Sequence, residues 1–273
     1  MKLRTAVIQV NTRDNLAENL SNVERFLDQA AGMGAQFVGL PELWTYLGPN
    51  PGYDGAAQTI PGPIIEILQE KARKHKMIVH GGSIIERDPQ LTGKFYNTSV
   101  LIDRDGEIVA RYRKIHLFDV DLANGEKHYE SQRIEPGSEI VTAAIDGITF
   151  GLTICYDLRF PELYRLLALK GAQIIMVPAG FTLYTGRDHW EVLLRARAIE
   201  NLCYVVAPAQ VGTYPPDRQC FGRSMIVNPW GLMLAQAQDS PTVIMAEIDL
   251  EQIEQARAQI PCLQNRRPTA YQW

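Results

Sequence analysis

Two eight-residue stretches of this chain follow the same pattern. Gly34-Ala-Gln-Phe-Val-Gly-Leu-Pro41 and Gly171-Ala-Gln-Ile-Ile-Met-Val-Pro178 match in register, and a predicted strand and helix precede each of them. A helix and strand are predicted after each as well. Two related βαβ halves can stack their sheets face to face with helices outside. The repeat therefore predicts an α/β fold with two facing sheets, and chance similarity between two short strands is the alternative.

Length and composition fit one large domain. The chain has 273 residues, of which 46% are hydrophobic and 21% charged, so it can bury a substantial core. We expect a single domain over residues 1–260 and a C-terminal tail, 261–273, that lies across a partner subunit. The net charge is −4 and the basic residues are dispersed, which argues against a nucleic-acid partner.

The termini and cysteines indicate a cytoplasmic protein. Residues 1–10 enter a predicted strand directly, without the features of a signal peptide, and no window has the length of a membrane span. The four cysteines, Cys155, Cys203, Cys220 and Cys262, show neither metal-type spacing nor a dense disulfide framework. We therefore expect a reducing compartment, no metal and no membrane partner.

Cys155 lies where a strand turns into a helix. The strand is predicted over residues 148–154, and Pro161 and Glu162 mark the first turn of the helix. Such an elbow lifts a side chain out of the sheet, and the following backbone N–H, that of Tyr156, can face a developing oxyanion. The alternative is that Cys155 is a small buried hydrophobic residue at the end of a core strand.

A carboxylate and an ammonium follow two other predicted strands. Glu42 lies in Gly39-Leu-Pro41-Glu42-Leu-Trp44, and Lys114 lies in Arg111-Tyr-Arg-Lys114-Ile-His116. With the segment from Gly151 to Arg165, these motifs resemble those of the nitrilase superfamily of carbon–nitrogen hydrolases. The resemblance runs from the first strand to about Ile248. It implies a four-layer α-β-β-α sandwich, an amidase mechanism through a cysteine thioester, and a homodimer or higher homo-oligomer.

The resemblance assigns a role to each group. Cys155 is the nucleophile, and Glu42 is the general base and acid, a role that suits a carboxyl whose pKa is raised by burial. Lys114, kept cationic by neighbouring carboxylates, stabilises the oxyanion together with the Tyr156 N–H. A second glutamate that orients the lysine matches Glu130, although Glu126 lies in the same segment. Protein groups supply all of this chemistry, so no cofactor is expected.

The segments expected to surround the substrate are most similar to one branch of the superfamily. The stretch from Cys155 to Leu163 and a long segment from His189 to Asn201 are similar to the Nit proteins, which comprise deaminated-glutathione amidases and ω-amidases. Residues 207–212, Ala-Pro-Ala-Gln-Val-Gly, are closer to the deaminated-glutathione branch. We therefore expect hydrolysis of deaminated glutathione to 2-oxoglutarate and cysteinylglycine. Hydrolysis of 2-oxoglutaramate is the alternative.

Three residues are candidates for binding this acidic substrate. Arg159 can bind a carboxylate through its guanidinium fork, or it can form an ion pair with Asp157 or Glu162. Phe181 and Thr185 are predicted to line the pocket from a loop over residues 179–188, before a helix that begins at His189. A strand is also predicted over residues 77–85.

Two further interpretations remain. An aliphatic nitrilase uses the same three catalytic residues, and a catalytically idle member of the superfamily acts as a thiol sensor or an interaction protein. The presence of Glu42, Lys114 and Cys155 together argues against an idle protein. His116 invites pairing with the cysteine, but the context of a papain-like protease is missing around Cys155, so we interpret it as structural.

Overall fold

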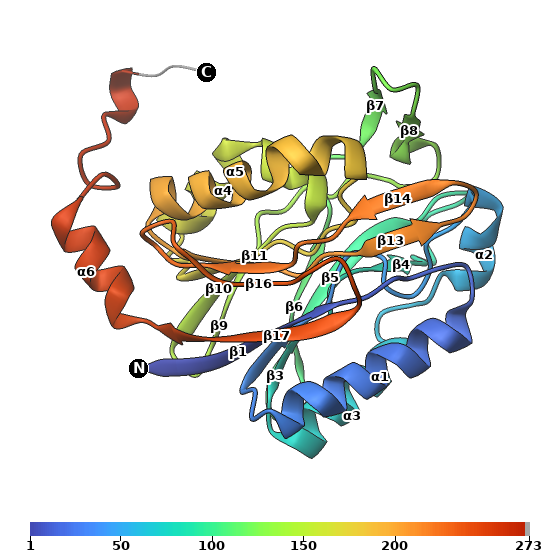
Figure 1. Ribbon diagram of the computed structural model, residues 1–273, viewed down its shortest axis with the longest axis horizontal. Helices are drawn as coiled ribbons and strands as arrows, with labels where there is room; N and C mark the ends of the chain where they lie inside the picture. Colours follow the sequence, from blue (N-terminus) through green and yellow to red (C-terminus); the bar gives the residue numbers. More distant parts are fainter. Residues whose placement is uncertain (271–273) are drawn as a thin grey trace.

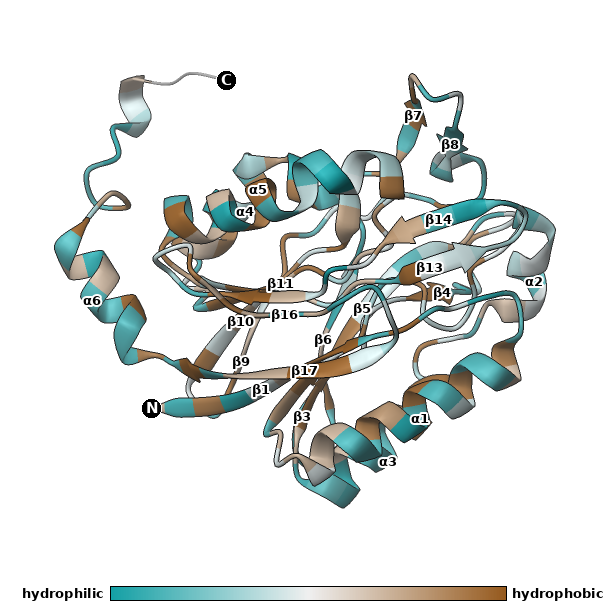
Figure 2. Cartoon of the chain, viewed as in Figure 1, coloured by the Kyte–Doolittle hydropathy of each residue, from teal (hydrophilic) through white to brown (hydrophobic). Residues whose placement is uncertain are grey.

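Two β-sheets face one another in the computed structural model, which describes residues 1–270, and helices cover both outer surfaces (Figure 1). This is the α-β-β-α arrangement predicted from the sequence. Hydrophobic residues lie along the strands, and the helices alternate hydrophobic and hydrophilic residues (Figure 2).

The first sheet has seven strands in the order β17-β1-β2-β3-β5-β4, with β6 paired to β5. They are β1 (Lys2–Gln9), β2 (Phe37–Gly39), β3 (Ile78–His80), β4 (Ile84–Glu86), β5 (Tyr96–Ile102), β6 (Ile108–Arg113) and β17 (Thr242–Asp249). Helices α1 (Leu16–Gly32) and α3 (Pro63–His75) cover its outer face. The apolar stripe of α1 that includes Val23, Phe26 and Leu27 is buried there, as its periodicity predicts.

The second sheet has six strands in the order β16-β15-β12-β11-β10-β9. They are β9 (Thr142–Ile145), β10 (Ile148–Leu152), β11 (Ile174–Met176), β12 (Tyr204–Ala207), β15 (Met225–Val227) and β16 (Met233–Gln236). Its outer helices are α4 (Pro161–Leu169) and α5 (Leu183–Asn201). Strand β11 lies between its parallel neighbours β10 and β12 as β2 lies between β1 and β3. The repeat that contains β2 and β11 thus corresponds to equivalent positions in two βαβ halves.

The inner faces of the two sheets form one continuous core. Phe37 of β2 and Phe150 of β10 meet edge to face across it, with ring centroids 5.0 Å apart. Gly39, at the end of β2, lies close to residues of the opposite sheet beside the site described below. A Cβ at this position would be 3.0 Å from the Met176 Cε and 3.4 Å from the Pro208 Cγ. Glycine here therefore lets the two sheets pack closely.

The structure differs from two of the sequence predictions. The strand predicted over residues 77–85 is broken into β3 and β4, because Gly82 has φ +58° and its backbone packs against the Pro41 carbonyl. Helix α5 begins at Leu183 rather than His189, because the Thr182 side chain caps it by accepting a hydrogen bond from the Thr185 N–H. Thr185 therefore lies in the first turn of a helix and not in a loop.

Short elements surround one end of the sandwich. They are η1 (Asn50–Gly52), α2 (Tyr53–Ala56), the hairpin of β7 (Asp119–Asp121) and β8 (Lys127–Tyr129), η2 (Glu130–Gln132), η3 (Cys155–Arg159), and the hairpin of β13 (Val211–Tyr214) and β14 (Arg218–Phe221). The first hairpin lies between β6 and β9 and the second between β12 and β15, and neither was predicted from the sequence.

The chain leaves the sandwich at its C-terminal end. Helix α6 (Glu251–Gln259) follows β17, and the segment after it, with the short helix η4 (Pro268–Ala270), extends beside the molecule rather than over it (Figure 1). The last three residues of the predicted tail, 271–273, lie outside the described residues. No helix within residues 1–270 is long and apolar enough to cross a membrane.

Candidate active site

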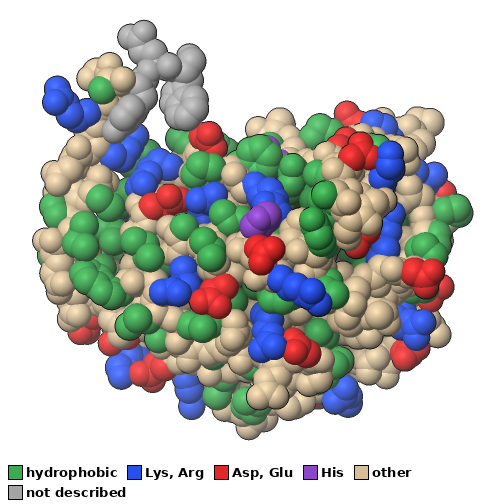
Figure 3. Space-filling model, turned by 45° about the horizontal axis from the view of Figure 1, so that its top comes forward, with side chains coloured by type: hydrophobic (Ala, Val, Ile, Leu, Met, Phe, Trp, Pro, Cys, Tyr) green, Lys and Arg blue, Asp and Glu red, His purple; other side chains and the backbone are tan. Residues whose placement is uncertain are grey.

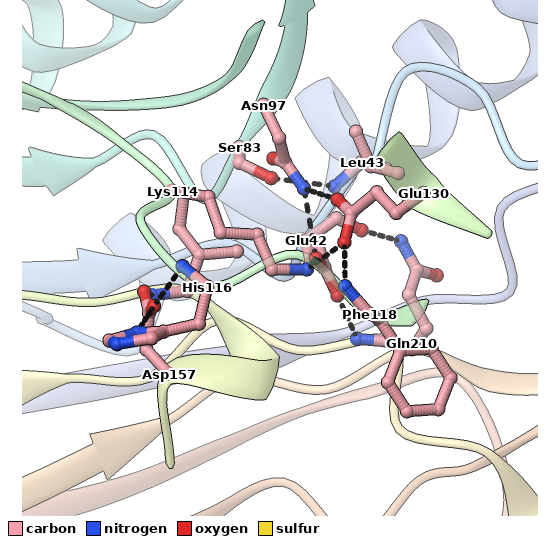
Figure 4. Close-up of polar contacts among 12 residues, drawn as sticks. Glu42, Leu43, Ser83, Asn97, Lys114, His116, Phe118, Glu130, Asp157 and Gln210 are labelled. Atoms are coloured by element: carbon pink, nitrogen blue, oxygen red, sulfur yellow. Dashed lines mark hydrogen bonds and ion pairs between the residues drawn. The ribbon is translucent and has the colours of Figure 1, made fainter. Parts of the chain in front are cut away.

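Lys114 is enclosed by two carboxylates at the end of the first sheet. Its Nζ lies 2.8 Å from the Glu42 Oε1 and 2.8 Å from the Glu130 Oε2 (Figure 4). Asn97 of β5 ties the two acids together, because its Nδ2 donates to Glu42 Oε1 at 2.9 Å and to Glu130 Oε1 at 3.1 Å. The Lys114 side chain is only 2% exposed, so these ion pairs are not screened by water.

Glu42 is held in place from several directions. It lies three positions after the end of β2, and its Oε2 accepts a hydrogen bond of 2.8 Å from the Gly180 N–H, beyond β11 of the opposite sheet. Its backbone carbonyl accepts a hydrogen bond of 2.8 Å from the Gln210 Nε2. The next residue, Leu43, has φ +48°, and its N–H donates to the Ser83 Oγ at 3.0 Å. The carboxylate is thus aimed by an unusual backbone conformation that its neighbours hold in place.

Cys155 occupies the elbow predicted from the sequence. It is the first residue of η3, after β10, with φ +47°, and its N–H donates to the Pro178 carbonyl at 2.9 Å. A left-handed backbone is uncommon for a residue with a side chain, and such strain is found at functional positions. The Tyr156 N–H follows at the start of the turn, where N–H groups lack an acceptor within the helix.

Asp157 fixes this turn from inside the protein. Its Oδ2 accepts hydrogen bonds from the Ile154 N–H at 2.8 Å and the Tyr112 hydroxyl at 2.6 Å. Its Oδ1 lies 2.7 Å from the His116 Nδ1 and accepts from the His116 N–H at 3.1 Å. The His116 ring stacks on Phe160 with centroids 3.6 Å apart. His116 therefore supports the turn after the cysteine, in agreement with the structural interpretation of this residue.

Cys155, Glu42 and Lys114 meet at one cavity, and their charges are coupled. Burial raises the pKa of the Cys155 thiol well above its ordinary value, and the negative charge of Glu42 raises it further. Burial also disfavours the charged form of Lys114, but Glu130 and Glu42 outweigh it and raise the pKa of the ammonium. The protein therefore holds a protonated cysteine beside an ionised lysine.

The pKa of Glu42 moves in the opposite direction from the prediction. Burial by itself raises the pKa of this carboxyl, as expected. The charge of Lys114 and hydrogen bonds from Lys114, Cys155 and Gly180 lower it, and the net pKa lies below the ordinary value of a glutamate. The expectation was wrong because it counted burial without the ammonium 2.8 Å away. Glu42 is thus ionised and ready to accept a proton at neutral pH.

The two candidates for the second glutamate are clearly separated. Glu130, at the start of η2, contacts Lys114 and also accepts a hydrogen bond of 2.8 Å from the Phe118 N–H. Glu126 turns away and contacts Asn124 at 2.7 Å and the His128 Nε2 at 3.4 Å. Of the two, only Glu130 is in a position to orient the lysine.

The cavity beside the thiol encloses about 200 Å3. Arg159, Phe181 and Thr185, predicted to bind substrate, all line it. The Arg159 guanidinium lies 5.1 Å from the Phe181 ring centroid and 3.2 Å from the His189 Nδ1. Within residues 1–270 neither of the acids considered for an ion pair, Asp157 and Glu162, forms a salt bridge with it. The charge of Arg159 is therefore available to a ligand.

Sequence reasoning missed several residues of the site. Asn97 is a fully buried amide in β5, where Thr98 and Ser99 follow it, so no local contrast in polarity marked it in the sequence. Four other missed residues, contributed by α2 and by the two hairpins, line the cavity: Tyr53, His128, Tyr214 and Arg218. Their positions depend on contacts between residues that are distant in the sequence, and no local sequence pattern marks them. Within residues 1–270 no group of three His, Cys, Asp or Glu side chains is arranged to hold a metal ion.

Comparison with known proteins gives consistent results. The family model described as carbon-nitrogen hydrolase matches residues 4–258. A deaminated glutathione amidase of a Synechocystis species is 43% identical over 96% of this chain and 97% of its own length. An omega-amidase of Danio rerio is 36% identical over 99% of this chain and 96% of its own. The crystal structure of Saccharomyces cerevisiae Nit3, described as a member of branch 10 of the nitrilase superfamily, matches with a TM-score of 0.88 at 32% identity, covering 97% of both chains.

Proposed function

The chain belongs to the carbon–nitrogen hydrolase family, and we propose that it hydrolyses deaminated glutathione through a thioester on Cys155. The reaction begins when the Cys155 Sγ attacks the amide carbonyl carbon while Glu42 takes the thiol proton. The carbonyl oxygen becomes an oxyanion, which the Lys114 ammonium and the Tyr156 N–H stabilise. The observation that carries this proposal is the buried contact of Lys114 with both Glu42 and Glu130 beside the thiol.

Collapse of the tetrahedral intermediate breaks the C–N bond. Glu42 returns its proton to the departing nitrogen, which leaves as an amine and exposes the thioester to water. Glu42 then takes a proton from the attacking water, and the second intermediate collapses with cleavage of the C–S bond. That proton returns to the sulfur, so Cys155 and Glu42 end in their starting states. Glu130 holds the ammonium in position throughout.

The proposed substrate rests on a relative and on one charged residue. A relative that matches nearly the whole chain is named a deaminated glutathione amidase, and the product acid of that reaction, 2-oxoglutarate, carries a carboxylate away from the scissile amide. Arg159 lines the cavity without a carboxylate partner among residues 1–270 and can bind such a group. The omega-amidase relative favours 2-oxoglutaramate as the second candidate, since the acyl half of that substrate is the same.

A direct comparison of substrates tests this proposal. Purified enzyme is offered deaminated glutathione and 2-oxoglutaramate at matched concentrations, and 2-oxoglutarate, cysteinylglycine and ammonia are followed with Cys155→Ala as the control. We expect a kcat/KM at least tenfold higher for deaminated glutathione. A preference for 2-oxoglutaramate would make the protein an omega-amidase, and the absence of Cys155-dependent turnover of both substrates would refute the assignment.

We also propose that two copies pair through the outer face of the second sheet. Large hydrophobic side chains are exposed on α4 and α5, among them Leu166, Leu169, Val192 (66% exposed) and Ile199. Figure 3 looks onto this side of the molecule and shows hydrophobic side chains gathered near the C-terminal segment. Apolar patches of this kind mark interaction surfaces, and the extended tail can lie across a second copy. We place the enzyme in the cytoplasm, where Cys155 remains a reduced thiol.

Light scattering on the purified protein is expected to give twice the chain mass of 30.7 kDa, or a multiple of that dimer. Val192→Asp introduces a charge at an exposed hydrophobic residue of this face and should shift the mass toward the monomer. Val109→Asp, at a residue of β6 that is 37% exposed on the other sheet, serves as the matched control. A monomeric wild-type protein would contradict the dimer.

A further inference from the structure

A second arginine lines the cavity at a distance from Arg159. Arg218 begins β14, and its guanidinium NH1 lies 3.1 Å from the His128 Nδ1 while NH2 donates to the Lys127 carbonyl at 3.1 Å. Both anchors belong to β8, so the guanidinium is held between the two hairpins. Within residues 1–270 it forms no salt bridge with a carboxylate.

The anchor at His128 is a neutral acceptor. Burial lowers the pKa of His128, and the charge of Arg218 lowers it further, so the ring is uncharged at neutral pH. Its Nδ1 then accepts the hydrogen bond from Arg218, and its Nε2 carries the proton that faces the Glu126 carboxylate at 3.4 Å. Arg218 is therefore fixed in place without having its charge neutralised.

Aromatic rings separate the two arginines. The Arg159 guanidinium lies 5.8 Å from the Tyr156 ring centroid, and that ring is 5.0 Å from Phe118. Phe118 is in turn 5.0 Å from the His128 ring, whose Nδ1 accepts the hydrogen bond from Arg218. Among residues 1–270 neither arginine has a carboxylate partner. Arg159 lies in the turn after the nucleophile, and Arg218 lies beyond the three rings just described. This arrangement matches a ligand with negative charge at both ends.

We propose that Arg218 binds the carboxylate of the leaving group, so that the preferred amide carries one carboxylate on its acyl side and another on its amine side. This inference rests on the proposed function. In deaminated glutathione a keto carbon and two methylenes separate the acyl carboxylate from the scissile carbonyl, and this carboxylate can reach Arg159. The glycine carboxylate lies on the opposite side of the scissile bond, at the end of a two-residue leaving group that spans roughly 7 Å when extended. Ammonia, the leaving group of 2-oxoglutaramate, has no carboxylate that Arg218 could bind.

The test combines a variant with a modified substrate. Wild type, Arg218→Gln and Arg104→Gln are compared on deaminated glutathione, on its C-terminal carboxamide and on 2-oxoglutaramate. Arg104 is a matched control outside the cavity, because its guanidinium is also held by one side chain, Asp146, and one backbone carbonyl, that of Lys76.

We expect Arg218→Gln to lower the ratio of kcat/KM for deaminated glutathione over 2-oxoglutaramate by about 10- to 100-fold, as for loss of a charge-assisted hydrogen bond. The wild-type enzyme should lose a similar factor on the carboxamide, and on that substrate the variant and wild type should agree. Arg104→Gln should leave the ratio unchanged.

The outcomes separate this inference from the proposed function. Wild-type hydrolysis of deaminated glutathione with an unchanged ratio in Arg218→Gln, or with full activity on the carboxamide, would overturn the role of Arg218 alone. A wild-type enzyme that does not hydrolyse deaminated glutathione would overturn both. The carboxamide measurement uses unmodified protein, so it holds even if Arg218→Gln folds poorly.

Discussion

Replacing Lys114 with methionine is expected to lower kcat by about 100- to 1,000-fold, which is the effect of removing one donor to an oxyanion. The loss is large because the ammonium is buried, with a side chain only 2% exposed, and because water cannot take its place. Steady-state kinetics on the preferred amide measure the change. KM should move little, since the oxyanion forms only after binding.

The same substitution should also destabilise the protein. Without the ammonium, Glu42 and Glu130 face each other in the interior, and breaking a buried ion pair costs about 3–5 kcal/mol in the free energy of unfolding. The double variant Lys114→Met/Glu130→Gln removes one unbalanced charge and should regain part of that stability without regaining kcat. Recovery of both quantities would show that Lys114 acts only by supporting the fold.

Replacing Glu42 with glutamine is expected to lower kcat by about 100- to 10,000-fold while making the cysteine easier to alkylate. The amide cannot accept the thiol proton, so turnover stops at the first step. At the same time the variant loses the negative charge that helps to raise the pKa of Cys155, and the positive charge of Lys114 remains. More of the sulfur is then thiolate at neutral pH, and iodoacetamide labelling should be faster than in wild type.

This pair of measurements separates an enzyme from a thiol sensor. In a sensor the reactivity of Cys155 is the function, and a variant that labels faster would be a better sensor. In the proposed amidase the same variant is inactive. Parallel loss of labelling and turnover would contradict the expected effect of the Glu42 charge on the Cys155 pKa and would show that alkylation also needs Glu42 as a base, with circular dichroism as the check that the variant is folded.

The wild-type pH profile follows from the same charges. The active state has Glu42 ionised and Cys155 protonated. The pKa of Glu42 lies below the ordinary 4.5, and that of Cys155 lies well above 9.0. Activity should therefore be flat across the neutral range and fall on the acid side only as Glu42 becomes protonated, below about pH 4.5. A midpoint near pH 6 would show that burial dominates at Glu42 instead.

The sequence was most informative about the reactive side chains that lie just after predicted strands. Glu42, Lys114 and Cys155 could be identified as candidates because the motifs around them resemble those of the nitrilase superfamily, and the structure places all three at one cavity. The two-sheet architecture was predicted from the repeat that contains β2 and β11. These features are local patterns, which a single sequence carries.

Features that depend on distant contacts were missed. Asn97 bridges two acids that lie 55 and 33 residues away from it, and its strand gives no sign of either. The direction of the Glu42 pKa depends on an ammonium 72 positions further along the chain. Arg218 belongs to a hairpin whose Tyr-Pro-Pro-Asp connection hides the alternation of a strand.

The site takes its groups from both sheets. Asn97 lies in β5, and Glu42 and Lys114 follow β2 and β6, whereas Cys155 and Gly180 follow β10 and β11. The hydrogen bond from the Gly180 N–H to Glu42 crosses between the two halves. Neither half can therefore turn over substrate before the inner faces have docked. During folding, catalytic activity can therefore arise only once the two sheets have docked, and a chain with complete secondary structure but undocked sheets should have none.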